Sequence, residues 1–278
     1  MKNKLKAIGS AFLYTGIYVL MQVFVSFQFM SIFSIKILLS NINELYNNNI
    51  YALESLYKDL LQFTIPILII AGIIAIVISF GIYSYFNKKP FTQLKLKKIN
   101  VSYVIIAILL FIPVMGLSNF IVDMVLKIFP NGYSAYVDTI IKPMENTPIL
   151  ILILGVGIIA PIVEELIFRG FIFSRLRNAF SIWSAIIIQG VFFAIFHGNI
   201  IQMSYAFFIG IILGILVYKS NSLYPAIILH ILNNTMSVFS DFNFDNFLYY
   251  LLPIIAIIMV VLIIFDKQIV NVYKSKSI

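Results

Sequence analysis

The chain has 278 residues, of which 62% are hydrophobic and only 11% are charged. This composition excludes a water-soluble globular protein, because such a protein needs far more polar surface to face water. The net charge of +8 is interpreted as a signal of membrane orientation rather than of nucleic-acid binding, and a sequence without cysteine excludes disulfides and thiolate chemistry.

Apolar segments long enough to cross a membrane recur along the whole chain. A spanning helix needs roughly 20 apolar residues, so the sequence predicts an all-α, polytopic membrane helix bundle with about eight transmembrane helices. The predicted spans cover about 8–35, 62–86, 101–126, 147–176, 181–198, 200–218, 223–240 and 247–265. The first apolar run is too long for the core of a signal peptide and is interpreted as a retained helix.

The connections between these spans alternate in charge. The odd-numbered connections, which include "NGYSAYVDTIIKPMEN" and "SDFNFDN", hold few lysines and most of the acids outside the spans. The N-terminus, "NKKPFTQLKLKK", "SRLRN", "YKSNS" and the C-terminal tail hold nearly all the other positive charges. The positive-inside rule therefore predicts a multi-pass protein of the cell membrane with both termini in the cytoplasm. Eight spans also require both termini to share a side.

The sequence predicts one membrane domain over residues 1–278. Within it, residues 1–140 form N-terminal transmembrane helices, residues 147–240 form a catalytic core, and residues 247–278 form a last helix with a basic cytoplasmic tail. The sequence predicts that the whole chain is embedded in a lipid bilayer. The sequence makes no prediction of oligomeric state.

Charged residues inside apolar spans are the first candidates for function, since such groups face the bundle interior or a wet cavity. In "EELIFR", Glu165 and Arg169 are four residues apart, so they share a helix face and are expected to pair. Glu164 points about 100° away and is left without that partner. One interpretation is a purely structural ion-pair network, and the other is a carboxylate free to act on a substrate.

The chain has only two histidines, and both lie in apolar segments. His197 follows Phe193 by four residues in "FFAIFH", and His230 precedes Asn234 by four in "HILNN". Hydrogen bonds between helices are the simplest role for a histidine within a membrane. If the three helices meet, however, Glu164, the histidines and Asn234 would supply a general base, a group that orients water, and donors for an oxyanion.

No protein nucleophile is indicated, since there is no cysteine and no GxSxG sequence. Water activated by Glu164 is the simpler hypothesis. A divalent metal such as zinc is the alternative, because two histidines and a glutamate (His197, His230 and Glu164) form a known zinc ligand set. The HExxH spacing is absent, so no spacing in the chain demands a metal.

The motifs EExxxR, FxxxH and HxxxN occur in this order on successive apolar segments, between about Leu150 and Ser240. Together they resemble the CAAX protease and bacteriocin-processing (CPBP) family, which includes type II CAAX prenyl endopeptidases. The resemblance implies an eight-helix intramembrane endopeptidase, described as a metalloprotease or as glutamate-dependent, with a cavity open toward the cytoplasm. Processing of a peptide or membrane-protein substrate, or immunity to a bacteriocin, is the role it implies in a bacterial setting.

The resemblance also implies a role for each matching residue. Glu164 would activate water with help from His197, while His230 and Asn234 would stabilise the oxyanion. Glu165 and Arg169 would be the supporting pair, and Phe193 would form part of the substrate wall. This hypothesis requires the catalytic residues to lie at similar depths in the membrane. At 1.5 Å per residue, His230 lies about 10 Å and His197 about 20 Å from the cytoplasmic start of its span.

Two other functions are compatible with the sequence. A non-catalytic membrane regulator or scaffold, for example in envelope maintenance, would use the same fold without hydrolysis. A proton-coupled transporter would use the same acids and histidines, but the sequence lacks the paired helix interruptions of two matching repeats.

Overall fold

The computed structural model describes residues 2–40, 57, 58, 60–87, 89–96, 99–239 and 246–265, and every regular element in these residues is a helix. The six helices that are long and apolar enough to cross a membrane include the composite helix Ile149–Leu176. The other five are α1 (Lys2–Ser40), α4 (Thr64–Tyr85), α6 (Val101–Ile128), α13 (Ile200–Ser220) and α15 (Asn246–Phe265). Two further helices, α12 (Ile182–Phe196) and α14 (Tyr224–Val238), have 15 residues each. The predicted membrane helix bundle is confirmed, and the count of about eight holds only when these two short helices are included.

Short helices lie at the connections. Helix α5 (Pro90–Gln93) follows α4, and the segment after α6 contains α7 (Gly132–Tyr136), a π-helical turn (Val137–Ile141) and α8 (Lys142–Glu145). Three of the helices begin directly after a polar residue whose side chain accepts a backbone N–H of the first turn. These capping residues are Asn100, Ser181 and Asn199.

The helix Ile149–Leu176 alternates between α-helical and π-helical hydrogen bonding. It comprises α9 (Ile149–Leu152), η2 (Ile153–Ile159), α10 (Ala160–Glu164), η3 (Glu165–Ile172) and α11 (Phe173–Leu176). Pi-helical segments are rare and are found frequently at functional sites. Here Glu164 ends the central α-helical turn and Glu165 begins the second π-helical segment.

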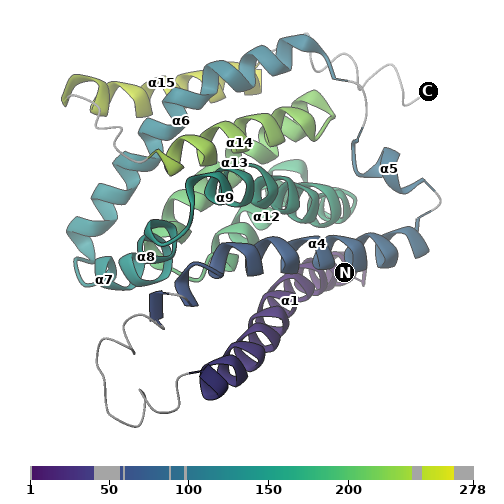
Figure 1. Cartoon of the computed structure of the whole chain (residues 1–278). Helices are drawn as coiled ribbons and strands as arrows, with labels where there is room; N and C mark the ends of the chain where they lie inside the picture. Colours follow the sequence, from purple (N-terminus) through teal and green to yellow (C-terminus); the bar gives the residue numbers. More distant parts are fainter. Residues whose placement is uncertain are drawn as a thin grey trace.

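Consecutive long helices run in opposite directions, so their ends gather at two ends of the bundle. The basic end holds the start of α1, the end of α4, the start of α6 and the end of α15, as Figure 1 shows. The acidic end holds α7 and α8, the start of α4, the end of α12 and the start of α13. Contacts agree with this division, since Lys95 binds Asn221 at the basic end, while Phe29 packs on Phe63 at the acidic end.

Glycines allow three close helix contacts around the middle of the bundle, as is common where helices pack in lipid. A Cβ at Gly155 would lie 2.4 Å from Ile65 of α4, and a Cβ at Gly157 would lie 2.7 Å from the Thr235 hydroxyl of α14. A Cβ at Gly210 of α13 would lie 3.1 Å from the Gly190 Cα of α12. The composite helix is therefore clamped between α4 and α14, which fixes where its two glutamates lie.

Candidate active site

Glu165 lies at the centre of a dry polar cluster. Its Oε1 accepts a hydrogen bond from Arg169 Nη1 at 2.8 Å, and the side chains of both residues are fully buried. The same oxygen lies 2.9 Å from His230 Nδ1 on α14. The pairing of Glu165 with Arg169 that the spacing predicts is present. The cluster also ties the composite helix to α14 through a charged contact that lipid-like surroundings make costly to break.

Arg169 has further partners that hold it in place. Its Nη2 donates to the Gly210 carbonyl at 3.2 Å, and its guanidinium lies 4.2 Å from the centre of the Phe193 ring. Gln189 donates to the same Gly210 carbonyl at 2.7 Å. Arg169 therefore connects the composite helix with α12 and α13, and its planar guanidinium suits both the carboxylate and the aromatic ring.

Glu164 is in a different situation from its neighbour. It is 8% exposed, and its Oε2 has no hydrogen-bond partner among the described residues. Its nearest charged contact is His230 Nε2, which lies 3.7 Å from that oxygen. The carboxylate lines a cavity of about 260 Å³. A buried carboxylate with a free oxygen beside a cavity can accept a proton from a molecule that enters it.

The two histidines meet on one aromatic ring. Phe193 makes edge-to-face contacts with His197 and with His230, at centroid distances of 4.8 and 5.8 Å. The unequal depths estimated along the helices therefore do not separate the histidines, because α12 and α14 differ in tilt or in starting level. Phe193 is buried and also lines a larger cavity of about 640 Å³, so it serves packing and cavity wall together.

The hydrogen bonds of the histidines define their tautomers. His197 Nδ1 lies 2.8 Å from the Phe193 carbonyl, which can only accept, so Nδ1 carries the proton and Nε2 is left with a lone pair. His230 Nδ1 faces the Glu165 carboxylate and likewise carries a proton. A second proton on His230 Nε2 would make this ring a donor toward Glu164. The geometry thus gives both imidazoles a proton at Nδ1, and His230 Nε2 donates only when the ring carries a second proton.

Asn234 is positioned by a proline in the composite helix. Pro161 has no N–H, so the carbonyls one helical turn earlier lose their usual donor. The Asn234 amide donates to the Val156 carbonyl at 3.3 Å, and the Thr235 hydroxyl donates to the Gly157 carbonyl at 3.3 Å. These side chains of α14 replace the missing backbone donor, and this fixes the Asn234 amide at the cavity wall.

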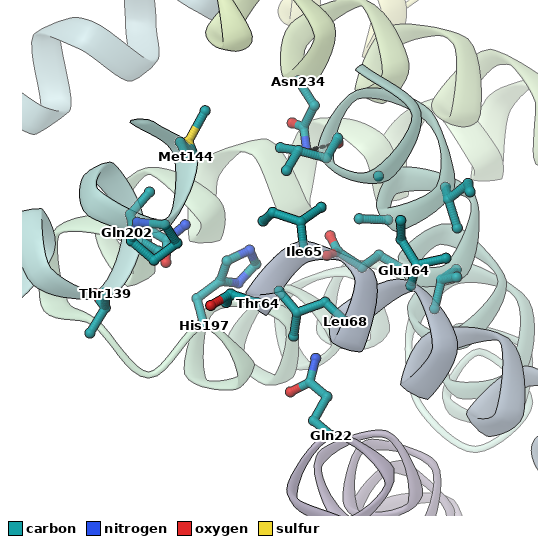
Figure 2. A pocket seen from close by; sticks show the side chains of 18 of the residues that line it. Gln22, Thr64, Ile65, Leu68, Thr139, Met144, Glu164, His197, Gln202 and Asn234 are labelled. Carbon is teal, nitrogen blue, oxygen red and sulfur yellow. Dashed lines mark hydrogen bonds between the residues drawn. The ribbon is translucent and has the colours of Figure 1, made fainter. Parts of the chain in front are cut away.

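The four predicted catalytic residues surround two neighbouring cavities. Glu164 lines the smaller cavity and His230 the larger one, while His197 and Asn234 line both. Figure 2 shows Glu164, His197 and Asn234 approaching the smaller cavity from three different helices. The structure thus brings together side chains that lie far apart in the sequence.

The cavities extend from the middle of the bundle to its acidic end. Their walls include Thr139 and Met144 of the connection between α6 and the composite helix, and Gln202 in the first turn of α13. Helix α1 begins and helix α15 ends at the opposite, basic end. A cavity open toward the cytoplasm and termini in the cytoplasm were both predicted from the sequence. The two predictions cannot both hold if the termini lie where α1 begins and α15 ends, because the cavities lie toward the opposite end.

The residues of the site do not form a ready metal centre. Among the described residues, no group of three or more histidine, aspartate or glutamate side chains gathers closely enough to hold one metal ion. The predicted zinc set of Glu164, His197 and His230 therefore does not fit this arrangement.

Several residues of the site were not anticipated from the sequence. Gln189 supports Arg169 through Gly210, Thr235 supports the proline-containing turn, and Gln202 lines both cavities. Gln189 lies four residues before Phe193 and Thr235 lies beside Asn234, so their positions on the same helices were the available signal. Gln22 and Thr64 complete the smaller cavity from α1 and α4, where no motif marks them.

The chain was compared with known proteins. A family model described as type II CAAX prenyl endopeptidase Rce1-like matches residues 146–236. No curated protein and no solved structure matches the chain. The matched segment contains the three motifs and every site residue predicted from them. Residues 146–236 of this membrane protein are therefore similar to the type II CAAX prenyl endopeptidase Rce1-like family.

Proposed function

We propose that this chain is an intramembrane endopeptidase in which Glu164 activates the attacking water. The single observation that carries the proposal is the contrast between two adjacent glutamates. Glu165 forms a fully buried ion pair with Arg169 at 2.8 Å, whereas Glu164 lines a cavity and its nearest charged contact is His230 at 3.7 Å. An acid kept unpaired in an apolar interior is costly and is retained where it does chemistry.

The hydrolytic step follows from the positions of the polar atoms. Glu164 takes a proton from a water molecule in the cavity, and the free Nε2 of His197 accepts a hydrogen bond that orients this water. The water oxygen bonds to the peptide carbonyl carbon, and the carbonyl oxygen becomes an oxyanion. His230 Nε2–H and the second N–H of Asn234 donate to that oxyanion. The C–N bond then breaks, and the proton held by Glu164 passes to the leaving nitrogen.

The neighbouring groups support the charges of this step. With His230 protonated, the cluster of two carboxylates, one guanidinium and one imidazolium is electrically neutral. Glu165 stabilises the imidazolium through the contact at Nδ1. Glu165 and Arg169 are thus positioning residues, and residues 147–240 form the catalytic core on which the N-terminal helices place Gln22 and Thr64.

The experiment is cleavage of a defined peptide library by the purified protein in proteoliposomes, followed by mass spectrometry. We expect Glu164→Gln to lower the rate by roughly 10²- to 10⁴-fold, the usual contribution of a general base. Asp138→Asn is the matched control, because Asp138 is an exposed acid that pairs with Lys142 outside the cavities. Equal cleavage by wild type and Glu164→Gln would overturn the proposal.

A chelator separates the glutamate route from the metal route. In the glutamate route, cleavage is unchanged after dialysis against EDTA and 1,10-phenanthroline. Loss of cleavage that added Zn²⁺ restores would instead assign the reaction to a metal centre. A protein that cleaves no member of the library, and whose cellular phenotype survives Glu164→Gln, would be a scaffold or regulator.

A further inference from the structure

The two ends of the bundle differ strongly in charge. Among the described residues, the basic end holds eight lysines and arginines and no acid, whereas the acidic end holds four basic and three acidic residues. The eight are Lys2, Lys4, Lys6, Lys89, Lys95, Arg175, Arg177 and Lys219. The acidic end holds Lys36, Lys58, Lys127, Lys142, Asp123, Asp138 and Glu145. Lysine and arginine accumulate on the cytoplasmic side of a membrane protein, whatever its function.

The cavities are confined to the half of the bundle that faces the acidic end. The smaller cavity is lined by the first turns of α4, the turn Thr139–Met144 and the end of α12. The larger cavity adds the second halves of α6 and α14. In Figure 2, Thr139 and Gln202 lie on the opposite side of His197 from Glu164. A molecule that enters through the α7–α8 region therefore meets His197 before Glu164.

The basic half is closed over the same cluster by direct contacts between helices. The Tyr103 hydroxyl donates to the Lys219 carbonyl at 3.0 Å, and the Leu223 N–H donates to the Lys95 carbonyl at 3.1 Å. Tyr83 and Ser174 join α4 to α11 at 3.1 Å. These contacts connect α6, α13, α4 and the composite helix on the cytoplasmic side of Glu165, where a route to the cavities would have to pass.

We propose that substrates reach this site from the non-cytoplasmic face of the membrane. That the entering molecule is a substrate rests on the proposed function. The membrane face from which it enters is inferred from the charges at the two ends and from the position of the cavities. The substrate class is then a peptide already exported, or a segment of a membrane protein just outside the bilayer. A prenylated cytoplasmic protein would meet the closed, basic end instead.

The experiment uses the fact that the chain has no cysteine, so every introduced cysteine is unique. Ser134→Cys and Thr139→Cys report on the acidic end, and Asn178→Cys reports on the basic end. All three positions are exposed. A membrane-impermeant maleimide is applied to intact cells and, separately, to permeabilised cells. We expect Ser134→Cys and Thr139→Cys to be labelled in intact cells, and Asn178→Cys only after permeabilisation.

The reverse pattern, with Asn178→Cys labelled in intact cells, would overturn the proposal, and so would equal labelling of all three. This readout does not need hydrolysis, so it is independent of the proposed function. A second readout links the direction of entry to the cleavage reaction. Because Thr139 lines the smaller cavity and Ser134 lines neither, a bulky maleimide added from outside is expected to stop cleavage by Thr139→Cys and to spare Ser134→Cys. Cleavage that continues unchanged in labelled Thr139→Cys would contradict entry by this route.

Discussion

The basic and acidic halves of the bundle use polar residues in opposite ways. In the basic half, polar groups form direct bonds between helices, as when Lys219 donates to the Ile264 carbonyl at 2.5 Å and Tyr103 bonds the Lys219 carbonyl. In the acidic half, polar side chains such as Glu164, His197 and Gln202 line two cavities. Direct hydrogen bonds thus stabilise the basic half. In the acidic half, polar groups remain accessible to molecules in the cavities, at a cost in stability.

The largest predicted effect on stability comes from the cluster between the halves. Arg169→Met would leave the Glu165 carboxylate buried without its cation, and breaking such a pair costs roughly 3–5 kcal/mol. We expect a large fall in the apparent melting temperature in detergent, together with loss of cleavage. Lys142→Met is the matched control, since Lys142 also pairs with an acid four residues away but with side chains 43% and 55% exposed. Because solvent screens that exposed pair, Lys142→Met should change stability little, so equal losses in the two variants would contradict the proposed role of Arg169.

A smaller effect is expected where the composite helix touches α14. In Gly157→Ala the new Cβ would lie 2.7 Å from the Thr235 hydroxyl and 3.2 Å from the Thr235 Cα. Helix α14 must therefore shift, at a cost of roughly 1–3 kcal/mol for overpacking. Because Asn234 moves with it, cleavage should slow by up to about 10²-fold.

The control for this contact is Gly81→Ala in α4, where nothing lies within 4 Å of the new Cβ. Alanine favours a helix over glycine by roughly 0.5–1 kcal/mol, so Gly81→Ala should be neutral or stabilising and should cleave normally. Both variants are compared by melting temperature and by cleavage rate. Normal cleavage by Gly157→Ala would show that the position of Asn234 is not critical.

The smallest effect is predicted in the basic half. Tyr83→Phe removes the hydroxyl that contacts Ser174, while Ser174 keeps its bond to the Phe171 carbonyl. The loss should be about 0.5–1.5 kcal/mol, and the cleavage rate of the folded protein should not change. A Tyr83→Phe variant with normal stability but reduced cleavage would show that the basic half takes part in the reaction.

Spacing along one helix predicted the local features of the site. The interval of four residues predicted the Glu165–Arg169 pair, because residues at this spacing share a helix face whatever surrounds them. Apolar length likewise predicted the membrane helices, since hydrocarbon thickness fixes the minimum span. The short lengths of α12 and α14 were harder to predict, because a short connection such as "HGNI" does not define the residue at which a helix ends.

Contacts between helices were beyond reach of the sequence. Pairing of Glu165 with His230 depends on the approach of α14, and that approach depends on Gly157 and on the donors that replace the N–H of Pro161. The side on which the site lies could likewise not be related to the predicted topology from the sequence. The charges of the connections and the motifs were interpreted separately, and only the fold relates Glu164 to the end at which α7 and α8 lie.

The most direct test of the difference between the two adjacent glutamates is the apparent melting temperature of Glu164→Gln beside that of Glu165→Gln. If Glu165 stabilises the cluster and Glu164 serves the reaction, Glu165→Gln leaves Arg169 unpaired and melts well below wild type. Glu164→Gln removes a buried charge with an unpartnered oxygen, so it melts at or above the wild-type temperature while cleavage is lost. If Glu164→Gln loses as much stability as Glu165→Gln, both glutamates are structural and the account is contradicted.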